Sequence, residues 1–228
     1  MTQLQLARQN IITQEMKHVA MDEDLDPEYI RERIADGKVV IPANHKRKAT
    51  KICGIGAGLR TKVNANIGTS ADYPDVENEM EKLRAAEEAG ADAVMDLSTG
   101  GDLRAIRKKI IGSASIAVGS VPIYEAAVKT VQHKHAIVDM TATDMLEAIR
   151  LHCEDGVDFI TVHCGATKGV LKHLKESKRI CGVVSRGGTF LVEWMIHSGK
   201  ENPLYEEYDE ILAIAKEYDV TISLGDAM

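Results

Sequence analysis

The chain has 228 residues, of which 44% are hydrophobic and 28% charged, so it can bury a substantial core, and a wholly disordered chain is excluded. Its net charge is −7 and only 4% of its residues are aromatic, which argues against a nucleic-acid partner. No apolar stretch reaches the length of a membrane span, and the first residues lack a signal-peptide core. We therefore expect no membrane contact and a cytoplasmic location.

Residues 1–58 predict a mostly helical segment ahead of the main domain. One helix is expected over residues 4–20. Asp26-Pro27 is typical of a second helix start, because Asp caps a helix and Pro fits its first position. That helix is expected to end near Ala35, and residues 39–43 are expected to be extended.

Residues 59–228 alternate between short apolar runs and helical patterns. Strands are predicted at 62–68, 93–98, 115–124, 157–164, 182–187 and 220–225. Helices are predicted at 75–90, 102–111, 124–132, 143–155 (with Thr143 as its cap), 167–176, 188–197 and 206–218. Short apolar strands separated by helices are typical of a parallel sheet buried on both faces.

Six such units predict an α/β fold, a (β/α)₈ TIM-type barrel with six of its eight strands present. The alternative is an open six-stranded sheet. A barrel of this type closes only with eight strands, so the chain is expected to be a C-terminally truncated part of a longer protein.

Polar or functional groups end every predicted strand. They are Asn64 and Asn66, Met95-Asp96, Tyr124, His163-Cys164, Ser185-Arg186-Gly187-Gly188 and Asp226. In a β/α barrel the chemistry lies at these carboxyl ends. The Ser185–Gly188 run combines glycine at a helix start with a fixed cation, which suits a phosphate or a carboxylate. The residues thus predict a site for a small phosphate-bearing molecule and leave the reaction open.

The four cysteines, Cys53, Cys153, Cys164 and Cys181, form no CxxC pair and have no zinc-type spacing. In a reducing compartment they are expected to be free thiols. No metal site is expected within this chain.

Several runs together resemble one family over nearly the whole chain. They are Gly58-Leu-Arg-Thr-Lys-Val-Asn-Ala-Asn-Ile-Gly-Thr-Ser70, Val94-Met-Asp-Leu-Ser-Thr-Gly100, Val121-Pro-Ile-Tyr124, Val184-Ser-Arg-Gly-Gly188, Lys200-Glu-Asn-Pro-Leu-Tyr205 and Ser223-Leu-Gly-Asp226. The family is that of the thiamine pyrimidine synthases, also called phosphomethylpyrimidine synthases.

The resemblance implies a radical S-adenosylmethionine lyase with a (β/α)₈ barrel. Such an enzyme converts 5-aminoimidazole ribotide to 4-amino-5-hydroxymethyl-2-methylpyrimidine phosphate in thiamine biosynthesis. It also implies a [4Fe-4S] cluster, S-adenosylmethionine, a divalent metal (zinc or iron), an electron donor for the cluster, and a homodimer.

The family's substrate-binding positions correspond here to Asn66, Met95, Tyr124, His163, Ser185, Arg186, Gly187 and Asp226. The resemblance implies that Ser185, the Gly187 backbone and Tyr124 bind the ribotide phosphate. Asp226 would accept hydrogen bonds from the ribose or the aminoimidazole, and Asn66 and His163 would orient the ring. No catalytic residue is assigned.

This sequence departs from the family after Leu224-Gly-Asp226. There the family continues with an Arg-Pro-Gly turn, two more strands, two metal-binding histidines and a cysteine triplet for the cluster. The cluster and metal ligands are therefore expected beyond residue 228, and the chain alone is expected to be inactive. Two alternatives stay open: a 5-hydroxybenzimidazole synthase, which uses the same ribotide to make the lower ligand of a cobamide, and a non-catalytic ribotide-binding protein.

Overall fold

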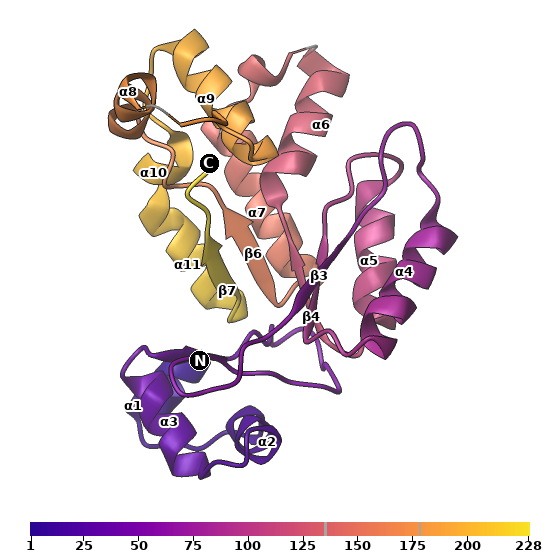
Figure 1. The fold of residues 1–228 in the computed structure, drawn as a ribbon, viewed down its shortest axis with the longest axis vertical. Coiled ribbons are helices and arrows are strands. Elements are labelled where there is room, and N and C mark those ends of the chain that lie inside the picture. The colour runs from indigo at the N-terminus through magenta and orange to yellow at the C-terminus, as the bar shows by residue number, and fades with distance from the viewer. Residues whose placement is uncertain (135, 178) are drawn as a thin grey trace.

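The centre of the molecule is a parallel sheet (Figure 1). The computed structural model describes residues 1–134, 136–177 and 179–228. Within these residues the sheet has five strands in the order β3-β4-β5-β6-β7, all parallel. The strands are β3 (Asn64–Ile67), β4 (Ala93–Asp96), β5 (Ala117–Ser120), β6 (Phe159–Val162) and β7 (Thr221–Leu224). The sheet does not close on itself, so β3 and β7 are its two edges in the part of the chain that the structure describes.

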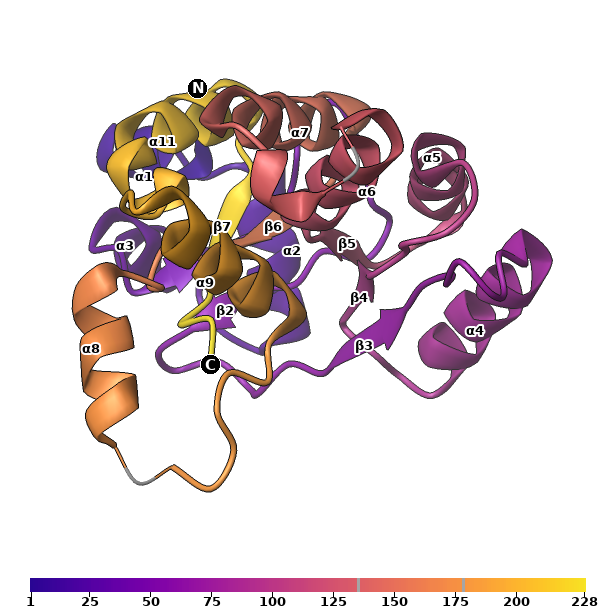
Figure 2. The same cartoon turned by 90° about the horizontal axis from the view of Figure 1, so that it is seen from above.

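Helices line one face of this curved sheet (Figure 2). Along the sheet lie α4 (Val76–Glu88), α5 (Leu103–Ser113), α6 (Pro122–Lys134), α7 (Ala142–Asp155) and α11 (Tyr208–Tyr218), with a short 3₁₀ turn at Ile137–Asp139. Nearer the carboxyl ends of the strands lie α8 (Lys168–Glu176), α9 (Arg186–Ser198) and α10 (Pro203–Glu206). Most begin at a side chain that accepts a main-chain N–H, such as Asp75, Asp102 and Thr167. No helix in the described residues is long and apolar enough to cross a membrane.

The two faces of the sheet differ because successive strand residues point to opposite sides. Val94, Val118 and Ile160 pack with the apolar faces of the helices in the main core. The opposite face carries a smaller apolar cluster that includes Phe159 and the partly buried Met95. Asn66 is the register partner of Met95 on the neighbouring strand. The sheet therefore presents a mixed polar and apolar surface on the face away from these helices.

The N-terminal segment has an apolar cluster of its own (Figure 1). It contains α1 (Gln3–Arg8), α2 (Gln14–Asp22) and α3 (Pro27–Ala35), followed by β1 (Val39–Val40), which pairs antiparallel with β2 (Ile55–Gly56). Met16, Ile30 and Ile34 are among its buried residues.

This segment is attached at the amino ends of the parallel strands. Arg47 pairs with the buried Asp158, which precedes β6, and donates to the carbonyl oxygens of Ala114 and Ile116 beside β5. Arg60, which lies just after this segment, donates its main-chain N–H to Glu23 within the segment and pairs with Asp92, which precedes β4. The N-terminal segment thus supports the end of the sheet opposite to the predicted site.

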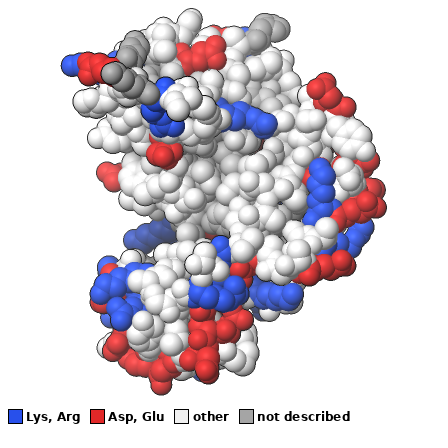
Figure 3. Space-filling model, in the orientation of Figure 1, with Lys and Arg blue, Asp and Glu red and all other residues white. Residues whose placement is uncertain are grey.

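Figure 3 shows Lys and Arg side chains interspersed with Asp and Glu over the N-terminal segment and over the edge formed by α4 and α5. The surface between these regions is mostly uncharged on this face. Neither sign of charge dominates the visible surface, so this view contains no extended electrostatic patch.

Five of the six predicted strands and the second helix start are confirmed. The predicted helix over 4–20 is wrong, because two helices occupy it. Asn10 adopts a left-handed backbone (φ 60°) after α1, and the Thr13 side chain then caps α2. The cap of α7 is Thr141 rather than Thr143, since Thr141 and Asp144 form a reciprocal capping box.

The predicted strand at 182–187 is also wrong. β6 pairs directly with β7, so no place in the sheet remains between them. Ser185 instead caps α9, and the residues that were expected to end a strand form the first turn of that helix. The third strand is shorter than predicted for a related reason, because Pro122 starts α6 and places Tyr124 on a helix.

Candidate functional site

Six of the eight predicted site residues lie around the first turn of α9. The Ser185 hydroxyl accepts the N–H of Gly188 at 3.2 Å, which fixes the start of this 13-residue helix. Gly188 is in close contact with the segment after β7, since a Cβ on Gly188 would lie 2.1 Å from the Ala227 carbonyl oxygen. Glycine therefore lets the chain after β7, which includes Asp226, pack against the start of α9.

His163 follows β6 and lies between two glycines. A Cβ on Gly187 would come within 2.4 Å of its Cε1 atom, and one on Gly225 within 3.3 Å of its Cδ2 atom. His163 is 5% exposed, and its Nδ1 is buried without a hydrogen-bond partner among the described residues. Burial lowers the pKa of His163, although the Asp226 carboxylate opposes this effect. The ring is therefore neutral at pH 7 and is confined in a slot between two main chains.

The His163 backbone is held by Asn202, which lies in one of the motif runs of the sequence but was not predicted as a site residue. Asn202 is fully buried, and its side-chain N–H donates to the His163 carbonyl oxygen at 2.9 Å. Its Oδ1 accepts from Leu204 N–H at the start of α10. Asn202 precedes a proline, a pattern that predicts a helix cap but gives no sign of the contact with His163.

Tyr124 and Arg186 face each other across α6 and α9. The Arg186 guanidinium lies 5.1 Å from the centre of the Tyr124 ring, within the range of a cation–π contact. Phe190, one turn along α9, packs edge-on against the same ring, with 6.2 Å between the two ring centres. Partial burial raises the pKa of Tyr124 despite the nearby Arg186, so its hydroxyl stays protonated and can donate a hydrogen bond.

Two cavities adjoin this cluster. One of about 550 Å³ is lined by Tyr124, Arg186, Phe190 and the loop at Thr99–Gly101. The other, of about 740 Å³, is lined by residues after β6 and β7, including Gly165 and Asp226. The exposed Asp226 accepts the N–H of Met228 at 3.0 Å. The cluster therefore borders space in which a small molecule could bind.

Asn66 and Met95 lie on β3 and β4, farther along the same sheet. Asn66 is exposed and accepts from the Asn64 side chain at 3.0 Å. Met95 is partly buried, and its sulfur lies 4.0 Å from the Thr161 hydroxyl on β6. Among the described residues, no hydrogen bond joins either side chain to the α9 cluster. The structure therefore groups six of the predicted residues and leaves these two on adjoining strands.

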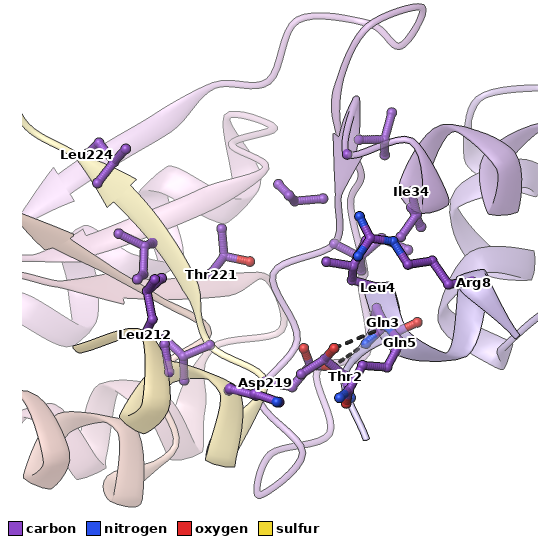
Figure 4. Close-up of a pocket in the computed structure, with 18 of the residues that line it drawn as sticks. Thr2, Gln3, Leu4, Gln5, Arg8, Ile34, Leu212, Asp219, Thr221 and Leu224 are labelled. Atoms are coloured by element: carbon purple, nitrogen blue, oxygen red, sulfur yellow. Dashed lines mark hydrogen bonds between the residues drawn. The ribbon is translucent and has the colours of Figure 1, made fainter. Parts of the chain in front are cut away.

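A separate pocket of about 580 Å³ lies between the N-terminal segment and the β7 edge (Figure 4). Leu4 and Ile34 line one side, and Leu212 and Leu224 line the other. Gln3 N–H donates to Asp219 across it at 2.9 Å. None of the eight predicted site residues lines this pocket, so it is distinct from the candidate site.

Comparison with known proteins identifies the family. The model of the radical SAM ThiC family matches residues 2–228. The chain belongs to the radical SAM ThiC family. It is 54% identical over 228 residues to the phosphomethylpyrimidine synthase of Desulforamulus reducens, covering all of this chain and 53% of that protein. The phosphomethylpyrimidine synthase of Dehalococcoides mccartyi has the same identity and the same coverage of both chains. That of Geobacter metallireducens is 54% identical over 226 residues, which cover 99% of this chain and 52% of that protein.

The chain of this ThiC family member spans about half the length of the curated relatives that it matches. The family resemblance inferred from the sequence motifs is thereby confirmed. Because α9 and its surroundings lie within the matched region, the group of six candidate site residues belongs to the part shared with these relatives.

Membership of a radical SAM family implies a [4Fe-4S] cluster and S-adenosylmethionine, but the described residues do not fit the cluster. Cys53, Cys153 and Cys164 are buried at separate places and Cys181 is exposed. Burial raises the pKa of Cys53 to about 11 and that of Cys153 to about 12, which makes both poor sources of the thiolates that a cluster needs. Among residues 1–134, 136–177 and 179–228, no three His, Cys, Asp or Glu side chains form a group that could hold a metal.

Proposed function

We propose that this chain forms the substrate-binding part of a radical SAM phosphomethylpyrimidine synthase. The whole enzyme would act as a lyase on 5-aminoimidazole ribotide and produce 4-amino-5-hydroxymethyl-2-methylpyrimidine phosphate for thiamine biosynthesis. The observation that carries this proposal is the convergence of Ser185, Arg186, Gly187, Tyr124 and a neutral His163 on the first turn of α9. The similarity to the named relatives over the same residues supports it.

The first turn of α9 is suited to the ribotide phosphate. Its first N–H groups have no partners within the helix, and the helix dipole favours an anion there. Since Ser185 Oγ accepts from Gly188, its own proton is free to point toward a ligand. Arg186 adds a cation that Tyr124 holds by its ring face. Together these groups would bind a phosphate dianion through directed hydrogen bonds and charge.

The remaining residues would orient the rest of the ribotide. A neutral His163 in a rigid slot can offer a directed hydrogen bond to the aminoimidazole without adding charge. The exposed Asp226 can accept from ribose hydroxyls, and Asn66 and Met95 would contact the ring from the neighbouring strands. A radical reaction depends on holding one C–H bond in place and excluding water, and positioning is what these residues supply.

The fold supports a larger assembly as part of the same proposal. Residues 59–228 would form five strands of a (β/α)₈ barrel that further strands complete at the β3 and β7 edges, with residues 1–58 as an N-terminal helical segment. The ligands of the [4Fe-4S] cluster and of a divalent metal, zinc or iron, would lie beyond residue 228. We also propose a homodimer and an external electron donor, following the family resemblance.

The test uses the polypeptide as its gene encodes it, purified anaerobically with its cluster reconstituted. With S-adenosylmethionine, a reductant and 5-aminoimidazole ribotide, we expect 5′-deoxyadenosine and the pyrimidine phosphate. Arg186→Gln should raise the KM for the ribotide, whereas Arg84→Gln, which removes an exposed arginine on α4, should leave it unchanged. Hydroxybenzimidazole as the product, or no 5′-deoxyadenosine, would overturn the assignment.

The 228-residue chain can be tested by itself for binding. Calorimetric titration with 5-aminoimidazole ribotide should show binding that Arg186→Gln weakens and Arg84→Gln does not. This chain should not cleave S-adenosylmethionine, since its described cysteines do not fit a cluster. Failure of the wild-type chain to bind the ribotide would refute the placement of the phosphate site on α9.

A further inference from the structure

A buried network of charged and polar side chains lies beneath the candidate site. Arg107 on α5 pairs with Glu125 on α6 and, at 2.6 Å, with Asp155 at the end of α7. His152 on α7 joins them through Nε2, which is 2.9 Å from a Glu125 carboxylate oxygen. Its Nδ1 lies 2.7 Å from the hydroxyl of Ser120. The network therefore connects three helices with the end of β5.

All of these groups are removed from solvent. The exposed fraction is 1% for Arg107 and Ser120, 2% for Glu125 and 4% for His152. The same network lowers the pKa of Glu125, because His152 and Arg107 stabilise its charged form against the penalty of burial. Glu125 Oε1 also meets Lys129, one turn along α6, at 2.6 Å. Both carboxylate oxygens of Glu125 are thus held in fixed directions.

The network acts on the short connection between β5 and α6. Ser120 is the last residue of β5, and Glu125 is in the first turn of α6, immediately after Tyr124. Adjacent helix residues point about 100° apart, so Glu125 can face the helices while Tyr124 faces α9. Fixing Ser120 and Glu125 at both ends of residues 120–125 therefore fixes the place and the angle of the Tyr124 ring.

We propose that Glu125, held by Arg107 and His152, is a positioning residue that sets Tyr124 against Arg186 for ligand binding. The effect on ribotide binding rests on the proposed function. The effect of Glu125 on the position of the Tyr124 ring does not, because it applies to the chain without a ligand. A displacement of this ring by a fraction of an ångström would also move Arg186, since the guanidinium lies over the ring.

General stability gives a weaker explanation for the network. Replacing a buried ion pair by apolar side chains of similar volume is often neutral or stabilising, so burying these charges contributes little net stability. What such a network adds is direction, because each hydrogen bond restricts an angle as well as a distance. Functional groups need supporting side chains that lock them within about 0.5 Å of the productive geometry, and Glu125 is adjacent to one such group.

The first experiment measures ribotide affinity by calorimetry in the 228-residue chain. Glu125→Gln keeps the shape but removes the charge, and Ser120→Ala is a milder change at the other end of the network. We expect Glu125→Gln to weaken binding about tenfold, which corresponds to about 1.4 kcal/mol. The matched control is Asp158→Asn, which disturbs a buried ion pair with Arg47 at the opposite end of the sheet. It should lower stability without changing affinity.

A double-mutant cycle separates positioning from general damage. If Glu125 acts through the Tyr124 ring, the loss of affinity caused by Glu125→Gln should largely vanish in a Tyr124→Ala background, which removes the ring and its contact with Arg186. An equal loss in both backgrounds, or unchanged affinity in Glu125→Gln and Ser120→Ala alike, would refute the inference while leaving the ribotide site intact.

A ligand-free measurement keeps the inference testable if the wild-type chain does not bind the ribotide. The six tyrosines can be labelled with 3-fluorotyrosine, and Tyr124→Phe identifies the ¹⁹F resonance of Tyr124. Glu125→Gln should shift or broaden that resonance, and Asp158→Asn should leave it unchanged. A Tyr124 resonance that is the same in Glu125→Gln and in the wild-type chain would overturn the positioning role whatever the ligand is.

Discussion

The packing of His163 against α9 makes a sharp prediction for Gly187→Ala. Replacing glycine by alanine within a helix ordinarily stabilises a protein by about 0.5–1 kcal/mol, because glycine loses more backbone freedom on folding. At Gly187 the added Cβ would lie 2.4 Å from His163 Cε1 and 2.7 Å from Nδ1. Carbon atoms in ordinary contact are about 3.5–4.0 Å apart, so the ring must move by about 1 Å.

The ring has little room for this movement. A Cβ at Gly225 would be 3.3 Å from the other side of the imidazole, and the side chain is almost fully buried. Overpacking of this kind costs about 1–3 kcal/mol. After the gain in helix propensity is subtracted, we expect Gly187→Ala to destabilise the chain by about 1–2 kcal/mol, which is a fall of about 4 °C in Tm for a chain of this size.

Gly112→Ala provides the matched control. Gly112 is the second residue from the end of α5, as Gly187 is the second residue of α9, and a Cβ there meets nothing within 4 Å. Urea unfolding should show that Gly112→Ala raises the free energy of unfolding by up to about 0.5–1 kcal/mol while Gly187→Ala lowers it. Ribotide affinity should fall only in Gly187→Ala. Equal stabilisation by both substitutions would refute the close packing of His163 on α9.

Three further predictions concern stability and binding. Burial lowers the pKa of His152 to about 4, so between pH 6.5 and 4 the unfolded chain binds a proton that the folded chain does not. Urea titrations should therefore show the free energy of unfolding falling by about 2 kcal/mol from pH 7 to pH 5. The fall should be smaller in His152→Gln. Arg47→Met leaves Asp158 buried without its cation and should cost about 3–5 kcal/mol in the same assay, and a cost under 1 kcal/mol would contradict the buried pair. Ser185→Ala and Thr167→Ala each remove a helix cap worth about 1 kcal/mol, but calorimetry should show weaker ribotide binding only for Ser185→Ala.

Local chemistry made much of the candidate site predictable. Residues at the predicted strand ends indicated Asn66, Met95 and His163, and the Ser185-Arg186-Gly187-Gly188 run indicated an anion site at a helix start. A helix does start at this run, but the strand that was predicted to precede it at 182–187 is not part of the sheet. The error arose because a short apolar run such as Gly182-Val-Val does not reveal whether a neighbouring strand is available for pairing.

The sequence by itself determined the α/β alternation, five of the strands, most of the helices and the family. These depend on residue spacing and on caps such as Asp26 and Ser185, whose interactions span only a few residues. Only the tertiary structure decided that β6 pairs directly with β7, that His163 lies between Gly187 and Gly225, and that Glu125 lies buried beside Tyr124. Those contacts join segments tens of residues apart, and they are selected by packing and by the need to pair every buried polar group, which no local pattern encodes.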